Sequence, residues 1–134
     1  YYLQNTRFVN NWDLVDLSAD KILGAYLFQR DQKILFQLAA SPLLWERRIA
    51  IISTFYFIKQ GEFKATMEIS KELLNDPHDL IHKAVGWMLR EVGKRDQSVE
   101  EAFLRQYSPK MPRTMLRYAI ERFPEELRQK YIKK

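Results

Sequence analysis

The segment NNWDLVD, residues 10–16, brings together an aromatic ring and a carboxylate that could do chemistry. Trp12 and Asp16 are four residues apart, and in a helix this spacing puts both side chains on one face, one turn apart. The question is whether that face points outward, as part of an active surface, or inward. The segment also has a structural interpretation, in which Asn11 caps the helix, Asp13 stabilises its first turn and Trp12 packs on the next helix. The choice between the two depends on the other motifs.

A second candidate face carries a tryptophan among cations. In the expected helix Pro77–Arg95, Lys83, Trp87, Arg90 and Lys94 follow helical spacing. They are offset by about 200° from an apolar stripe that suits the core. That stripe consists of Ile81, Ala84, Val85, Met88, Leu89 and Val92. Rings interleaved with Lys and Arg suit contacts with sugars and bases between phosphates, so this face predicts a nucleic-acid-binding surface. The alternative is that Trp87 fills the seam with a neighbouring helix.

Two arginines stand near the start of SPLLWERRIAIISTFYFI, residues 41–58, which is apolar nearly all round beyond them. Such arginines are costly unless they reach solvent, a carboxylate or a phosphate, and Arg47 has the option of pairing with an acid. Arg48, Lys83 and Arg117 are spaced by 35 and 34 residues, and each precedes small or aliphatic residues. This pattern is typical of stacked helical-hairpin repeats, so we expect Arg48 to point to the same face as Lys83.

The net charge of +5 is concentrated in one part of the chain. Residues 1–40 hold four of the 22 Lys and Arg and four of the 17 Asp and Glu, so the excess lies in residues 41–134. A basic surface fits an anionic partner such as DNA, although ordinary solubility would also explain the charge. The side chains that we predict to bind DNA phosphates are Arg47, Lys83, Arg90, Lys94, Arg113 and Arg117.

The pair His78 and His82 in HDLIH imitates the HExxH zinc motif. Asp79 is a methylene shorter than the usual Glu, and a third ligand would have to come from Glu100 or Glu101. We therefore predict no metal site.

Helical spacing of apolar residues runs through almost the whole chain, which predicts an all-α fold. We expect an α-α superhelix of about eight to nine helices in antiparallel pairs, with an irregular helical bundle as the alternative. Gly86 lies inside a helix at a cost of about 1 kcal/mol relative to alanine, which indicates that another backbone or a ligand approaches closely. The expected helices are Asn11–Leu17, Ala19–Arg30, Gln32–Ala40, Leu43–Gln60, Phe63–Asn75, Pro77–Arg95, Val99–Tyr107, Pro112–Arg122 and Pro124–Lys133.

Composition sets the broad class. With 134 residues, 46% of them hydrophobic, the chain suits a single helical-repeat domain over residues 1–134. The sequence has no cysteine and no apolar run of the length that a membrane span needs, so we expect a soluble, cytoplasmic protein and, by default, a monomer. The chain begins at Tyr1 with the helical pattern already close, so we expect it to be the C-terminal part of a longer chain.

Three motifs together resemble a known family. NNWDLVD, WERRIAIIS and IHKAVGWMLREVGKRD, in this order, are similar to the AlkD-like DNA alkylation repair glycosylases, which are built from HEAT-like helical repeats. The resemblance covers about residues 10–122. It implies an active surface formed by Trp12, Asp16, Arg48 and Trp87, where Arg48 is preferred to Arg47 because it directly precedes the small-aliphatic segment.

The resemblance also implies a reaction. Such an enzyme hydrolyses the N-glycosidic bond of purines alkylated at N3 or N7 in duplex DNA, without a cofactor. The alkylated purine carries a positive charge and leaves without a general acid, so one carboxylate, Asp16, would suffice to stabilise the cationic sugar. The alternative is a HEAT-like scaffold that binds DNA or protein without cleaving a bond.

Overall fold

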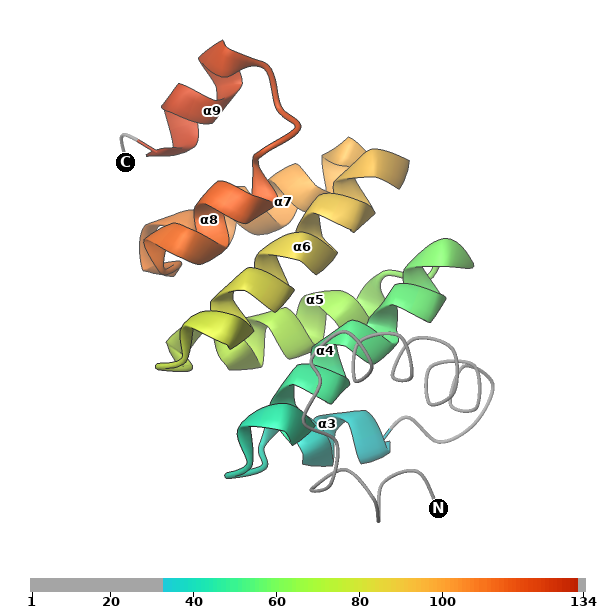
Figure 1. Ribbon diagram of the computed structural model, residues 1–134. Coiled ribbons are helices and arrows are strands. Elements are labelled where there is room, and N and C mark those ends of the chain that lie inside the picture. The colour runs from blue at the N-terminus through green and yellow to red at the C-terminus, as the bar shows by residue number, and fades with distance from the viewer. Residues whose placement is uncertain (1–32, 133–134) are drawn as a thin grey trace.

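Seven α-helices and two short 3-10 helices follow one another in the computed structural model, which describes residues 33–132 (Figure 1). The predicted all-α class is confirmed, and residues 33–132 contain no strand. The two helices expected at Asn11–Leu17 and Ala19–Arg30 lie outside the described residues. The helices are α3 (Lys33–Ala39), α4 (Leu44–Lys59), α5 (Lys64–Glu72), η3 (Leu73–Asn75), α6 (Asp79–Arg95), α7 (Gln97–Tyr107), η4 (Ser108–Lys110), α8 (Arg113–Ala119) and α9 (Glu125–Ile132).

Helix α8 ends at Ala119, three residues before the expected Arg122, and two of the other differences from the expected boundaries have local reasons. Helix α7 begins at Gln97 rather than Val99, because the Asp96 carboxylate caps it and accepts hydrogen bonds from both the backbone N–H and the hydroxyl of Ser98. The segment expected as one helix over Phe63–Asn75 is α-helical only to Glu72 and ends in the 3-10 turn η3.

The end of α4 is set by a glycine. Gly61 has φ of +83°, a backbone conformation that side chains other than glycine's disfavour. Its N–H donates to the Ile58 carbonyl and the next N–H, of Glu62, donates to the Phe57 carbonyl, both at 2.9 Å. This Schellman motif satisfies the last carbonyls of α4 and lets the chain reverse into α5.

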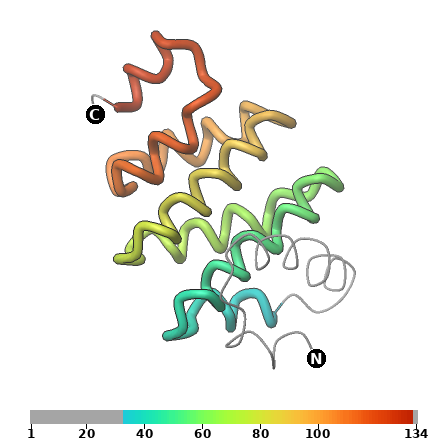
Figure 2. The backbone as a smooth tube through the Cα atoms, in the orientation of Figure 1, coloured from blue at the N-terminus to red at the C-terminus, as the bar shows by residue number. Residues whose placement is uncertain are grey.

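The helices form two layers (Figure 1 and Figure 2). Helices α4, α6 and α8 lie side by side and run in the same direction, while α5 and α7 return behind them. Helix α6 is the central member, because it packs on α4, α5, α7 and α8. Helix α9 lies at the end of the stack and is held there by the buried ring of Tyr131.

The core runs through the described helices as one hydrophobic cluster. All six residues of the stripe predicted for α6 are buried, which confirms that part of the interpretation. Helix α4 is buried over the whole of residues 48–54, since α3, α5 and α6 cover it from different sides. None of the helices within residues 33–132 is long and apolar enough to cross a lipid bilayer.

Gly86 is the point where α6 and α8 come closest. A Cβ atom at this position would lie 2.5 Å from Cβ of Tyr118 and 2.6 Å from the carbonyl oxygen of Met115. The close approach predicted from the sequence is therefore confirmed, and it is made by the backbone of α8.

The three positions of the suspected repeat are structurally equivalent. Arg48, Lys83 and Arg117 each lie four residues after the first residue of their helix, and these helices are α4, α6 and α8. The spacing in the sequence therefore corresponds to the stacking of one layer.

Candidate nucleic-acid interface

The candidate surface is the α4, α6 and α8 layer, because every predicted site residue within the described part of the chain lies there. Trp12 and Asp16 lie outside the described residues. The others are Arg47 and Arg48 on α4, Lys83, Trp87, Arg90 and Lys94 on α6, and Arg113 and Arg117 on α8.

Arg48 joins α4 to the first turn of α6. Its side chain is buried, and one guanidinium nitrogen donates to the carbonyl oxygen of Leu80 at 2.5 Å. A guanidinium has five N–H donors in a planar fork, which suits a phosphate as well as a carbonyl. The position of Arg48 is therefore fixed by α6 as well as by its own helix.

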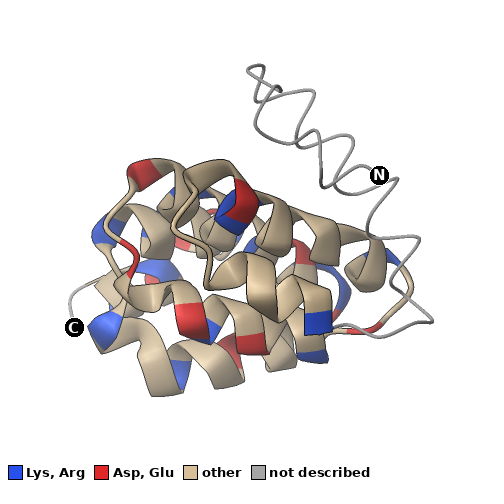
Figure 3. Ribbon diagram, turned by 90° about the horizontal axis from the view of Figure 1, so that it is seen from below, with Lys and Arg blue, Asp and Glu red and all other residues tan. Residues whose placement is uncertain are grey.

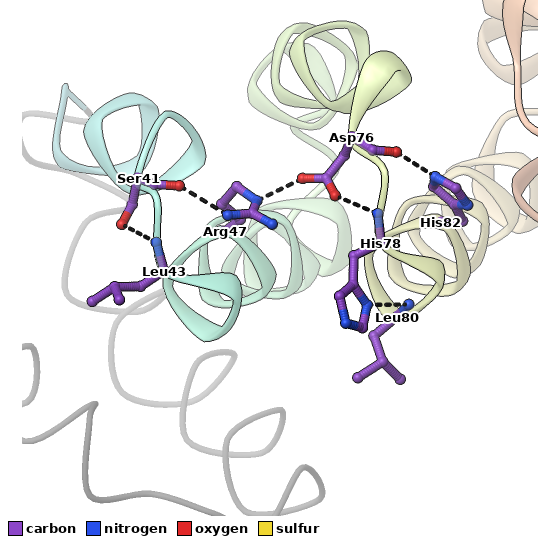
Figure 4. A network of polar contacts seen from close by, with 7 residues as sticks. All are labelled: Ser41, Leu43, Arg47, Asp76, His78, Leu80 and His82. Carbon is purple, nitrogen blue, oxygen red and sulfur yellow. Dashed lines mark hydrogen bonds and ion pairs between the residues drawn. The ribbon is translucent and has the colours of Figure 1, made fainter.

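Arg47 points to a different set of partners (Figure 4). Its Nε donates to the Asp76 carboxylate at 2.6 Å, and a terminal nitrogen donates to the Ser41 carbonyl at 3.1 Å. The Asp76 side chain is only 4% exposed, so Arg47 compensates a buried charge. The pairing of Arg47 with an acid, which the sequence left open, is present, and it favours a structural role over phosphate binding.

The histidine pair belongs to the same network. His78 caps α6, because its Nδ1 accepts from the Leu80 N–H at 3.2 Å. His82 turns the other way, and its Nε2 lies 2.5 Å from the carbonyl oxygen of Asp76 (Figure 4). The two rings thus have separate structural contacts, His78 with the first turn of α6 and His82 with the loop before it. Among residues 33–132, no group of three or more His, Asp or Glu side chains is arranged to hold a metal ion.

Trp87 lies at the seam between α6 and α4. Its ring centroid is 5.6 Å from that of Phe55, with the planes inclined by 59°. The Phe55 ring also has Lys59 Nζ at 4.7 Å and the Arg95 guanidinium carbon at 5.9 Å from its centroid. These are cation–π distances, so the seam combines two rings with two cations. Trp87 remains half-buried, so it both fills the seam and reaches the surface.

Phe55, Lys59 and Arg95 were missed by the sequence analysis. On α4, Phe55 follows Arg48 by seven residues and precedes Lys59 by four, so the three share one helix face. This spacing can be read from the sequence, but α4 has apolar residues on every side, so no single face of the helix stands out.

The cations of α6 are matched by acids. Lys83 pairs with Asp79 at 3.3 Å, and Arg90 pairs with Glu121, which follows α8. Figure 3 shows the mixture of both signs along the helices.

Glu91 binds two cations of its own helix, Lys94 at 2.9 Å and Arg95 at 3.2 Å. Burial acts to raise the pKa of the Glu91 carboxyl, but the hydrogen bonds and charges of Lys94 and Arg95 outweigh it and lower the pKa. Glu91 is therefore an anion under the surface of α6. Three acids thus pair with the four cations of α6, which leaves an excess of one positive charge. The acids are Asp79, Glu91 and Glu121, and the cations are Lys83, Arg90, Lys94 and Arg95.

The two arginines of α8 differ. Arg113 donates to the Ile132 carbonyl at 2.6 Å and so ties α8 to the end of α9. Arg117 is exposed and has no ion pair or hydrogen bond through its side chain to any residue of the described segment.

Comparison with protein families gives a match that covers all three helices of this layer. A family model described as DNA alkylation repair enzyme matches residues 1–123. The chain belongs to this family. None of the curated proteins compared with the chain matches it.

Membership among the DNA alkylation repair enzymes makes DNA the partner of this chain and DNA repair its role. The match includes the NNWDLVD segment and all of α4, α6 and α8. A repair enzyme must hold phosphates and reach the sugar and base of one nucleotide. Within the described layer, the cations and the half-buried Trp87 ring are the side chains suited to these two tasks.

A hollow of about 550 Å³ lies elsewhere on the repair enzyme, between α5 and α7 in the other layer. It contains none of the predicted site residues. Its walls are formed by Met67, Glu68, Lys71, Ser98, Val99, Ala102, Phe103, Gln106 and Tyr107.

Proposed function

We propose that this chain is a DNA glycosylase that excises positively charged N3- or N7-alkylated purines from duplex DNA. The observation that carries the proposal is the family match over residues 1–123, which covers a helix layer with Trp87 and three equivalent basic positions. The reaction would be hydrolysis of the N-glycosidic bond.

The chemistry needs only a few groups. An alkylated purine is already cationic, so the bond breaks without protonation of the base, and the sugar is left as an oxocarbenium-like cation. Asp16 is proposed to stabilise that cation and to orient the attacking water. Trp12 and Trp87 are proposed to pack on the deoxyribose, with a cation–π contribution as charge develops. No metal or cofactor takes part in this scheme.

The phosphates would be held by the cations of the layer. Arg48 is proposed as the central contact, with Lys83, Arg90 and Lys94 on α6 beside it. Exposed ion pairs such as Lys83 with Asp79 are worth only about 0–1 kcal/mol, so a phosphate can replace the acid. Arg117 on α8 has no such partner among residues 33–132, so a phosphate there would replace none of these acids.

The decisive experiment measures release of free 7-methylguanine from methylated duplex DNA by the 134-residue chain in the presence of a chelator. Asp16→Asn is expected to abolish release and to keep DNA binding, because it removes the charge and keeps the size of the side chain. Asp13→Asn, in the same segment, is the matched control and is expected to release base at the parent rate.

Other outcomes would argue against the proposal. Salt-sensitive DNA binding without base release would favour the non-catalytic HEAT-like scaffold. If binding were also absent, this chain would not act on DNA by itself. Equal release by the parent and Asp16→Asn would exclude Asp16 as the stabilising carboxylate.

A further inference from the structure

Arg90 and Glu121 form an ion pair that crosses between two helices of the candidate surface. Arg90 lies on α6, three residues after Trp87, and its side chain is 19% exposed. Glu121 stands in the turn after α8, and its side chain is 59% exposed. The pair joins positions 31 residues apart, so only the stacking of α6 and α8 brings it together.

Glu121 differs from the other acids that pair with cations of α6. Asp79 and Glu91 belong to α6 itself and bind cations three or four residues away. Glu91 is also buried, so it cannot leave its cations without a rearrangement of the helix surface. Glu121 comes from a turn of another element and, like Asp79, is mostly exposed, so its carboxylate can swing into solvent while the core stays packed.

A carboxylate and a phosphate bind a guanidinium through the same planar set of N–H donors. We propose that the Glu121 carboxylate competes with a DNA phosphate for Arg90, and that this competition limits the affinity of the chain for duplex DNA. This inference rests on the proposed DNA-binding role of the α4, α6 and α8 layer. A phosphate that takes the Nη1 donor of Arg90 must displace the Glu121 carboxylate, which holds that donor.

The competitor acts equally on damaged and undamaged DNA. Both must break the same ion pair, so the ratio of their affinities does not depend on Glu121. The quantity that Glu121 changes is the affinity for undamaged duplex, and with it the time that the protein spends on DNA without a lesion.

The test is a titration of a fluorescein-labelled undamaged duplex, followed by fluorescence anisotropy at several salt concentrations. Glu121→Gln removes the competing charge and is expected to tighten binding roughly two- to fivefold, the range of an exposed ion pair. Glu68→Gln is the matched control, because Glu68 is exposed on α5 in the other layer and its substitution changes the net charge by the same amount. It is expected to alter binding much less.

A double-mutant cycle separates competition at Arg90 from a general effect of charge. In the Arg90→Gln background, the gain from Glu121→Gln is expected to fall to that of Glu68→Gln. The inference is overturned if Glu121→Gln binds no more tightly than Glu68→Gln, or if its gain persists undiminished without Arg90. If the parent shows no salt-sensitive binding at all, the proposed DNA-binding role itself fails, which is a different result.

Discussion

At the scale of single residues, the ring of Phe55 contacts the ring of Trp87, and we expect this contact to hold Trp87 in position. An aromatic pair of this kind is worth about 0.5–1.5 kcal/mol beyond its buried area. Phe55→Leu keeps an apolar side chain but loses the ring, so we expect roughly a three- to tenfold lower single-turnover rate of 7-methylguanine release, with DNA affinity unchanged.

Phe63→Leu is the control for this prediction, since Phe63 is also partly buried but precedes α5. Thermal unfolding of both variants shows whether they are folded. A folded Phe55→Leu protein that releases base at the parent rate would show that Phe55 has no part in positioning Trp87.

Glu100 is a second residue with a measurable consequence. It is 1% exposed, and its Oε2 has no hydrogen-bond partner in the described part of the structure. Burial, and to a smaller extent the charge of Glu101, raise the pKa of Glu100 to about 9, against the lowering effect of Arg90. The carboxyl is therefore neutral at pH 7 in the folded protein, whereas in the unfolded chain it is ionised.

This difference makes stability depend on pH. Between the unfolded pKa of 4.5 and the folded pKa of about 9, the folded state holds one more proton than the unfolded state. The free energy of unfolding therefore falls as pH rises through this window, by at most about 1.4 kcal/mol per pH unit from this group. Glu100→Gln is expected to remove this slope, as measured by urea unfolding at several pH values. Glu68→Gln should keep it, and a slope that survives in Glu100→Gln would assign it to another group.

At the scale of elements, the contact between α6 and α8 depends on Gly86. Alanine has a higher helix propensity than glycine, by about 1 kcal/mol, but its Cβ would lie 2.6 Å from the backbone carbonyl oxygen of Met115. This clash cannot be relieved by rotating a side chain, because the oxygen belongs to the backbone of α8. We expect the overpacking to dominate and Gly86→Ala to lower the free energy of unfolding by about 1–3 kcal/mol. Chemical denaturation measures this change. Stability equal to or above that of the parent would mean that α8 moves away at little cost.

At the scale of the whole molecule, periodicity predicted the helices and the buried stripe of α6, because both follow from local spacing. The partners of the charged residues depend on how the helices stack. Arg47 meets Asp76 across 29 residues, and Arg90 meets Glu121 across 31. The sequence identified which residues are charged, but it did not indicate which acid of another element would reach them. Phe55 was missed for a related reason, since an apolar pattern on all sides of α4 does not reveal which side faces Trp87.

The three equivalent basic positions differ in what each must give up before it can bind a phosphate. Arg117 is exposed and has no partner in the described residues, Lys83 has to leave Asp79, and Arg48 is buried with its guanidinium on the Leu80 carbonyl. For a duplex that docks on this layer, the cost of contact therefore rises from α8 to α4. On the proposed docking surface, a phosphate therefore displaces least at Arg117 and most at Arg48, so the three equivalent positions of the repeat form a graded row of contacts.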